Sequence, residues 1–221
     1  MHDATTFYDI VGRFAKDYYV PDILLPTSSC IFVLESPHSQ EVKHGAPVAG
    51  SSGATMSKHL FGPECARQPL GLLVKENART RENPRLNGIG LVNVCNVPLQ
   101  KSAYGTKPPA SIPDDWFADM EYVRSNSQRV KYQTDRQNQI QDWLTGNLRA
   151  KLLTFCKKQL TLIPCGRFAQ KYVRLAAVHD DSWVVIDDVP HPSYNSWDRP
   201  RYQAQVAAVR RAVERAATLL R

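Results

Sequence analysis

The chain has 221 residues, with 28 basic against 21 acidic side chains and a formal net charge of +7. This length suits one well-packed domain, so we expect a single domain over residues 1–221. The positive charge favours an anionic partner, of which nucleic acid is the commonest. Membrane spans and secretion are disfavoured, because no apolar run approaches the ~20 residues of a spanning helix and the first residues lack the basic and apolar regions of a signal peptide.

The cysteines exclude the commonest metal sites. There are five of them, widely spaced, and no pair has CxxC spacing. This pattern argues against a zinc ribbon or an iron–sulfur cluster and is typical of reduced thiols in a cytoplasmic protein. A metal site formed by His38 and His44 with Cys65 or Glu41 is disfavoured, because no compact ligand spacing supports it. We therefore expect a cytoplasmic protein with neither metal nor cofactor.

The first half of the chain alternates between helical and strand patterns. Apolar residues at helical spacing predict a helix over residues 4–19. The continuous apolar run 30–34 predicts a central parallel strand, and a loop with several glycines follows over residues 36–53. A short helix is expected around residues 56–61, and the apolar run 89–93 predicts a second strand.

The second half continues this alternation after an irregular stretch. A basic, proline-containing loop follows the second strand, and residues 101–132, the most irregular part of the chain, are expected to form a mobile loop. We then expect a helix over residues 140–155, a strand over 160–163 and a helix from residue 166 onward. A buried strand over 183–187 and a closing helix over 206–220 complete the pattern. Strands separated by helices imply an α/β fold, a three-layer α/β/α sandwich with a central four-stranded parallel sheet.

Polar side chains stand at the ends of three predicted strands. Glu35 follows the first strand, Asn93 ends the second, and His191 follows the fourth. Ligands of open α/β sheets bind outside the carboxyl ends of the strands, so we expect these side chains to converge there. Ser193 lies two residues after His191 and can donate a hydrogen bond to an anion such as a phosphate.

These motifs together resemble those of the uracil-DNA glycosylase superfamily. The stretch Gly45–Gly53, GAPVAGSSG, is similar to the family motif G-x-P-F-x-G-x-x-G. Asn93 matches the asparagine of the second strand, and His191-Pro192-Ser193 matches the H-P-S motif. The matches keep the family's order from residue 31 to about residue 199. The resemblance implies a monofunctional DNA glycosylase, which flips a base out of DNA and hydrolyses its N-glycosidic bond to leave an abasic site.

The resemblance also implies a role for each matching residue. Glu35 would position water and stabilise the oxocarbenium-like sugar, and His191 would donate a hydrogen bond to the leaving base. Asn93 would read the base edge, within a base-binding set that also includes Ser36, His38 and Val48. The residues themselves add a set of expected DNA contacts, which are Ser51, Ser52, Gly53, Lys101, Lys107, Ser193 and Tyr194, with Trp197 as a minor-groove wedge and Arg199 as a phosphate clamp.

The sequence departs from the family pattern around the base. Val48 replaces the stacking phenylalanine, and His38 stands where some branches have a tyrosine. Ser36 replaces an aspartate or asparagine, Asn195 replaces the wedge leucine, and the cysteines do not match the iron–sulfur branch. We therefore hypothesise that the pocket accepts a larger, modified pyrimidine, such as a hypermodified cytosine of phage DNA. The biological role would be DNA repair or antiviral defence.

Structural interpretations of the same residues stay open. Glu35 can cap a helix or pair with a basic residue, Asn93 can satisfy loop backbone groups, and Trp197 can pack on the last helix. The basic loop with Lys101 and Lys107 can be a solvated face, and we expect Glu41 to be solvated.

Two other classes of function stay open as well. One is a catalytically silent nucleic-acid-binding module on the same fold. The other is a nucleotide-binding α/β enzyme, which is disfavoured because neither G-x-G-x-x-G nor a P-loop lysine follows the first strand. The expected partner is duplex or single-stranded DNA, and we expect a monomer that does not bind membranes.

Overall fold

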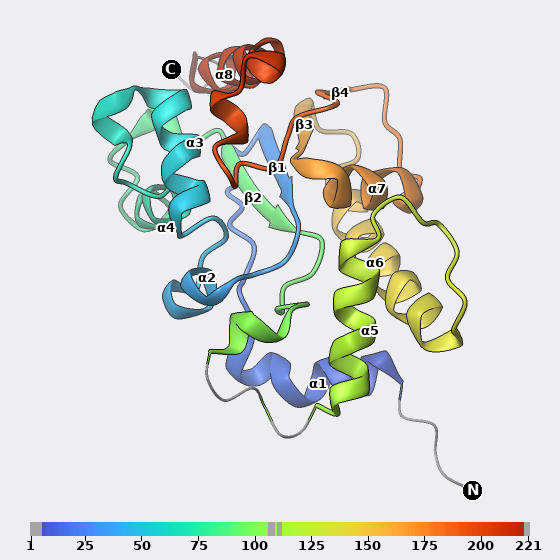
Figure 1. The fold of residues 1–221 in the computed structure, drawn as a ribbon. Coiled ribbons are helices and arrows are strands. Elements are labelled where there is room, and N and C mark those ends of the chain that lie inside the picture. Colours follow the sequence, from blue (N-terminus) through green and yellow to red (C-terminus); the bar gives the residue numbers. More distant parts are fainter. Residues whose placement is uncertain (1–5, 106–108, 110–111, 219–221) are drawn as a thin grey trace, which may run out of the picture.

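The computed structural model describes residues 6–105, 109 and 112–218, and a four-stranded, all-parallel sheet lies at its centre (Figure 1). The strands are β1 (Cys30–Leu34), β2 (Ile89–Asn93), β3 (Leu160–Pro164) and β4 (Trp183–Val185), in the order β2-β1-β3-β4. Leu34 pairs with Asn93, and Val33 pairs with Pro164, so the three neighbouring strands β2, β1 and β3 end almost level. Their carboxyl ends therefore form one continuous edge.

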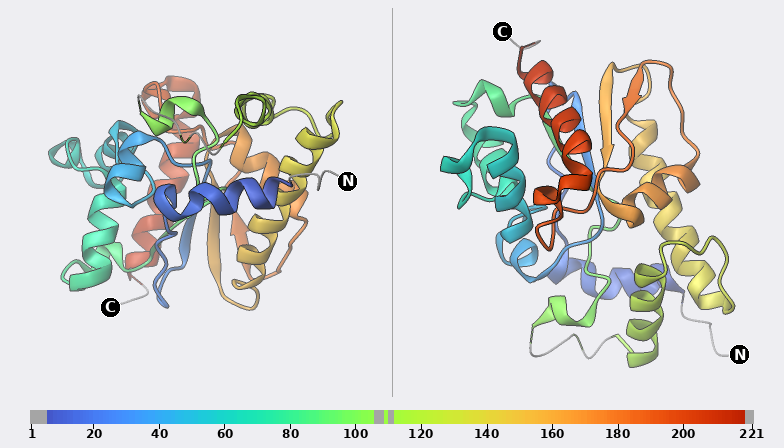
Figure 2. Two further views of the ribbon diagram at one scale, coloured as in Figure 1. Left: turned by 90° about the horizontal axis from the view of Figure 1, so that it is seen from below. Right: turned by 45° about the horizontal axis from the view of Figure 1, so that its top comes forward.

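Helices cover both faces of this sheet (Figures 1 and 2). They are α1 (Phe7–Tyr18), α2 (Ser39–His44), α3 (Ser51–Phe61), α4 (Leu70–Thr80), α5 (Asp114–Ser125), α6 (Asp135–Leu153), α7 (Gly166–Ala176) and α8 (Gln203–Thr218). Side chains of a strand alternate between its two faces. Ile31 and Val33 accordingly enter a core formed with α1, α5, α6 and α7, whereas Phe32 and Leu34 enter a core formed with α3, α4 and α8. The expected three-layer α/β/α sandwich is confirmed.

The fourth strand differs from the expectation of a buried strand. Val184 and Val185 are 55% and 43% exposed, because β4 lies at the edge of the sheet and pairs with β3 alone. An apolar run cannot distinguish an edge position from a central one. The strand ends at Val185, so residues 186–190 carry the chain on to His191.

The stretch expected to be a mobile loop contains the helix α5. Trp116, Phe117, Met120 and Val123 are all buried in one core, and they follow a helical spacing that the prolines nearby obscured. Helix α4 was not expected either. Within the described part of the chain, no helix combines the length and the apolar character that crossing a membrane requires. All five cysteines are free.

Candidate active site

Two neighbouring cavities open at the carboxyl edge of the sheet. The inner pocket, of about 410 Å³, is lined by the ends of β1 and β2, by α2, by the start of α3, and by residues of α5 and of the loop after β4. The outer groove, of about 600 Å³, is lined by the end of α5, the start of α7 and residues 188–202. The residues that line both cavities are Glu35, Arg124, His191, Ser193 and Tyr194. The expected convergence of strand-end residues therefore occurs, since Glu35, Asn93 and His191 all line the inner pocket.

The side chain of Asn93 is buried without hydrogen-bond partners. Its exposed fraction is 0%, and within the described part of the chain neither Nδ2 nor Oδ1 is paired. An unpaired polar group in the interior costs about 1–3 kcal/mol. A ligand in the inner pocket that offers one acceptor and one donor would satisfy both atoms.

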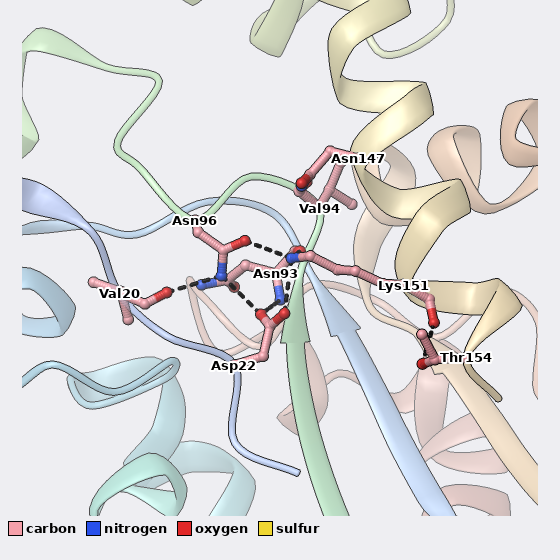
Figure 3. Close-up of polar contacts among 8 residues, drawn as sticks. All are labelled: Val20, Asp22, Asn93, Val94, Asn96, Asn147, Lys151 and Thr154. Atoms are coloured by element: carbon pink, nitrogen blue, oxygen red, sulfur yellow. Dashed lines mark hydrogen bonds and ion pairs between the residues drawn. The ribbon is translucent and has the colours of Figure 1, made fainter. Parts of the chain in front are cut away.

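The backbone of Asn93, in contrast, is firmly held (Figure 3). Its N–H donates to Asp22 Oδ1 at 2.9 Å, and its carbonyl oxygen accepts from Lys151 Nζ at 2.7 Å. Lys151 also pairs with Asp22 at 2.8 Å, and Asn96 bonds to both side chains. No motif in the sequence indicates this cluster, because its members come from the segment before β1, the end of β2 with the loop that follows, and the end of α6.

Glu35 forms an ion pair with Arg124 from the last turn of α5. Arg124 Nε donates to Glu35 Oε1, and the two side chains are 30% and 18% exposed, respectively. The apolar face of α5 packs into the core, which fixes the place from which Arg124 reaches the site. The sequence did not predict this residue, since it lies within the stretch interpreted as a loop.

Hydrogen bonds to His191 define its tautomer. The backbone N–H of Ser193 donates to His191 Nδ1 at 3.3 Å, and Ser193 Oγ lies 2.8 Å from the same nitrogen. A backbone N–H can only donate, so Nδ1 is the acceptor and the neutral ring carries its proton on Nε2. Burial lowers the pKa of His191, and nearby Arg124 lowers it further, while Glu35 opposes the shift. His191 is thus a neutral hydrogen-bond donor at physiological pH.

Two small residues shape the loop that carries His191. Gly166 begins α7 with φ +87°, and a Cβ there would lie 2.8 Å from His191 Cβ, so a larger residue would displace the histidine. Ser196 Oγ donates to the carbonyl oxygen of Ser193 at 2.8 Å and also bonds to that of His191. Both roles depend on three-dimensional contacts that no motif in the sequence indicates.

The expected base-binding residues line the inner pocket at different depths. Val48 is buried and adopts φ +46°, a conformation that costs a β-branched residue on the order of 1–3 kcal/mol. Ser36 Oγ is buried, and within the described residues it has no hydrogen-bond partner. His38 is exposed at the start of α2 and bonds to Ser39. The expectation that Glu41 is solvated is wrong, because its partly buried carboxylate accepts two backbone N–H groups.

Of the three DNA contacts expected at the start of α3, two line the inner pocket and one does not. Ser51 and Ser52 begin α3 and line the inner pocket, and the first turn of this helix contains no acidic residue. A helix N-terminus of this kind favours an anion. Gly53 is buried and is not among the lining residues of either cavity, and its contact with DNA stays a prediction. Its place is structural, since a Cβ there would meet the Val48 carbonyl oxygen at 1.7 Å.

Lys101 does not line either cavity. Lys101 is exposed, pairs with Asp114 at 2.6 Å and lies over the ring of Phe117. Its contact with DNA stays a prediction. Lys107 lies outside the described residues.

Trp197 does not occupy the place expected of a wedge. Its exposed fraction is 0%, its indole N–H donates to the Pro190 carbonyl oxygen at 2.9 Å, and it belongs to the core beneath α3 and α8. The structural interpretation, packing on the last helix, is therefore correct. Tyr194 is instead 90% exposed with φ +54° and lines both cavities. Arg199 is exposed and lines the outer groove together with Arg167 and Arg201.

No metal site is evident among the described residues, where no group of three or more His, Cys, Asp or Glu side chains could hold an ion. A scan against protein-family models finds no match for the chain, and a search of curated proteins finds no significant match.

Proposed function

We propose that the protein is a monofunctional DNA glycosylase that flips a uracil-like or bulky modified pyrimidine into the inner pocket and hydrolyses its N-glycosidic bond. The observation that carries the proposal is the Asn93 amide, which is buried and unpaired in the cavity that Glu35 and His191 also line. Extrusion of a base from the duplex is the general strategy of enzymes that act on a base.

Asn93 would recognise the edge of the flipped base. Its side chain offers one acceptor and two donor hydrogens, which suit the adjacent donor and acceptor of a pyrimidine edge. The hydrogen bonds to Asp22 and Lys151 hold its backbone, so little ordering would be required when a base binds (Figure 3).

His191 would stabilise the leaving base. When the N-glycosidic bond breaks, its electron pair moves to the base, and negative charge develops on a ring carbonyl oxygen. A donor that is already oriented stabilises such charge most effectively in a site with little water. The Nε2 proton of neutral His191 is this donor, because Nδ1 is occupied by Ser193.

Glu35 would act on the sugar. Its carboxylate stabilises the positive charge of the oxocarbenium-like sugar and accepts a proton from the water that attacks C1′. Arg124 bonds to Oε1, and we assign the other carboxylate oxygen, Oε2, to the water. The products are the free base and an abasic site.

The outer groove would receive the DNA backbone. Arg124, Arg167, Arg199 and Arg201 line it, against the acidic Glu35 and Asp188. Phosphate contacts from such side chains fix the register of the protein on DNA without reading sequence. Tyr194, exposed where the two cavities meet, would enter the space that the flipped base leaves.

The lining of the inner pocket favours a modified pyrimidine. Its volume of about 410 Å³ is typical of small-molecule sites. Such a site has a larger volume than a bare pyrimidine ring. Tyr194 is the only phenylalanine, tyrosine or tryptophan among its described lining residues, whereas Ser36, Gln40 and Gln100 offer polar groups to a substituent.

The proposal is tested by excision assays on duplexes that contain uracil, hydroxymethylcytosine or glucosylated hydroxymethylcytosine. We expect abasic sites with at least one of them, and the highest rate with a modified cytosine. Exclusive release of uracil would contradict the hypothesis of a modified substrate but support the glycosylase activity. Absence of abasic sites from all three would contradict the glycosylase.

One observation favours a second candidate, the catalytically silent DNA-binding module. The ion pair with Arg124 neutralises the charge on Glu35 that the reaction requires. In that case the parent protein would bind these duplexes and leave them intact, and Glu35→Gln would leave binding unchanged.

A further inference from the structure

The carboxylate of Glu41 connects two backbone positions in the wall of the inner pocket. Glu41 Oε2 accepts the N–H of His38 at 2.8 Å, and Oε1 accepts the N–H of Val48 at 2.6 Å. All three residues line the inner pocket. One side chain therefore ties the start of α2 to the loop that precedes α3.

Val48 requires such support because its backbone is strained. The residue is β-branched and adopts φ +46°, in the left-handed region that favours glycine. Strained backbone persists where the surrounding structure fixes it from several sides. The N–H of Val48 is held by Glu41, and its carbonyl oxygen accepts the N–H of Gly71 at 3.3 Å.

The loop also lies too close to two helices to relax. A Cβ at Gly53 in α3 would lie 1.7 Å from the Val48 carbonyl oxygen. A Cβ at Gly71 in α4 would lie 1.8 Å from the carbonyl oxygen of Pro47. These helices lie on one side of the loop, and the Glu41 side chain holds Val48 from the side of α2.

We propose that Glu41 is a positioning residue that holds Val48 in its strained conformation and thereby sets the wall, and so the substrate specificity, of the inner pocket. This inference rests on the proposed glycosylase function for its consequence in catalysis. It goes beyond that function because it assigns the shape of the pocket to a side chain that is hydrogen-bonded to two backbone positions of the wall.

The electrostatic surroundings make this contact depend on pH. Burial raises the pKa of Glu41 to about 7, although the hydrogen bonds from the His38 and Val48 backbone lower it, and the nearby charge of Glu35 adds to the rise. His38, which precedes α2, donates its backbone N–H to the carboxylate. Arg124 and His191 line the same pocket, and Lys75 of α4 donates to the His44 carbonyl oxygen. A protonated carboxyl group has one oxygen that carries a hydrogen, so it accepts two N–H groups less well.

Ionisation of Glu41 is expected to lower the stability of the fold and to raise activity. The pKa of Glu41 is raised from 4.5 to about 7, so the folded protein binds a proton more tightly than the unfolded chain. Its contribution to stability is fully present below pH ~4.5 and is lost as the pH rises through ~7. The ionised form is therefore costly for the fold, although it is the form that makes both hydrogen bonds well.

The test compares Glu41→Gln with the matched control Glu76→Gln, an exposed glutamate on α4. Hydrogen exchange of the Val48 and His38 amides is measured first, since it needs no substrate. We expect exchange in Glu41→Gln to be about 10-fold faster or more, with Glu76→Gln equal to the parent. Unchanged protection at both amides in Glu41→Gln would overturn the inference.

Activity provides the second measurement, with kcat and KM followed between about pH 6 and pH 9. We expect the parent's kcat/KM to rise through pH ~7, and Glu41→Gln to lose about 10-fold at pH 8 with a flatter profile. Thermal stability at pH 8 should not fall in this variant. A kcat/KM and profile equal to the parent, or a loss of activity explained by unfolding, would overturn the inference.

A second substitution isolates the strain. Val48→Gly adopts φ +46° without a steric penalty, so Glu41→Gln should change amide exchange in the pocket wall less in this background than in the parent. Fully additive effects would contradict the link between Glu41 and Val48. If the parent forms no abasic sites, the proposed function fails, and the exchange measurements still decide whether Glu41 holds the wall.

Discussion

The ends of β1 and β2 lie side by side, yet their polar side chains are satisfied in opposite ways. Glu35, after β1, is paired with Arg124. Asn93, at the end of β2, has a firmly bonded backbone and an unpaired buried amide. A buried charge without a partner costs much free energy, whereas a neutral amide that is unpaired until a ligand binds costs less. The difference suggests that Glu35 is oriented in advance and that Asn93 is completed by the substrate.

The largest effect is expected from Glu35→Gln. This change keeps the shape of the side chain and removes its charge, so the rate of base release should fall by about 10³-fold. Binding of the same duplex should change little, because the charge acts on the transition state. Single-turnover assays with an abasic-site readout measure this, and an unchanged rate would remove Glu35 from the mechanism.

Replacement of Asn93 by leucine should separate function from stability. Two lost hydrogen bonds of about 1–1.5 kcal/mol each correspond to a loss of roughly 100-fold in kcat/KM. The variant should nevertheless be more stable by about 1–2 kcal/mol, since it removes an unpaired buried amide. Urea unfolding and steady-state kinetics test both halves. Lower stability together with normal activity would mean that Asn93 is a structural residue.

The convergence of the strand-end residues follows from the sequence, but their partners do not. The apolar runs locate β1 and β2, and parallel strands bring their ends together, so the convergence of Glu35, Asn93 and His191 could be predicted. Arg124 could not, because it lies 89 residues from Glu35 and its helix was obscured by nearby prolines. The exposure of the aromatic side chains after His191 could not be predicted either. Two aromatic residues three positions apart, Tyr194 and Trp197, have opposite environments because only one of them fits beneath α3 and α8.

The partner of Glu35 is tested by Arg124→Gln. Arg124 lines both cavities, so its loss should remove the orientation of Glu35 and one phosphate contact. We expect kcat/KM to fall about 10-fold, and the slope of log Kd against log salt concentration to decrease by about 1. Arg210→Gln serves as the control, because Arg210 lies on α8, is exposed and lines neither cavity. Identical salt slopes for the two variants would exclude a phosphate contact by Arg124.

The smallest effect is expected from His191, whose Nδ1 accepts the backbone N–H of Ser193. Burial lowers its pKa below 6.5, so the folded state binds a proton less readily than the unfolded chain. The stability that neutral His191 contributes is present above pH ~6.5 and is lost as the pH falls through the lower folded value. The difference in unfolding free energy between the parent and His191→Gln should therefore shrink at acid pH. A difference that grows there would mean that His191 is charged in the fold.

We propose above all that the inner pocket hydrolyses the bond between a flipped base and its sugar. Mass spectrometry of the products from a modified-pyrimidine duplex tests it most directly, with borohydride added to trap any covalent intermediate. We predict free base and abasic sites in equal amounts, and no protein–DNA adduct. Intact DNA from every duplex, or a trapped adduct on a lysine, would contradict the account.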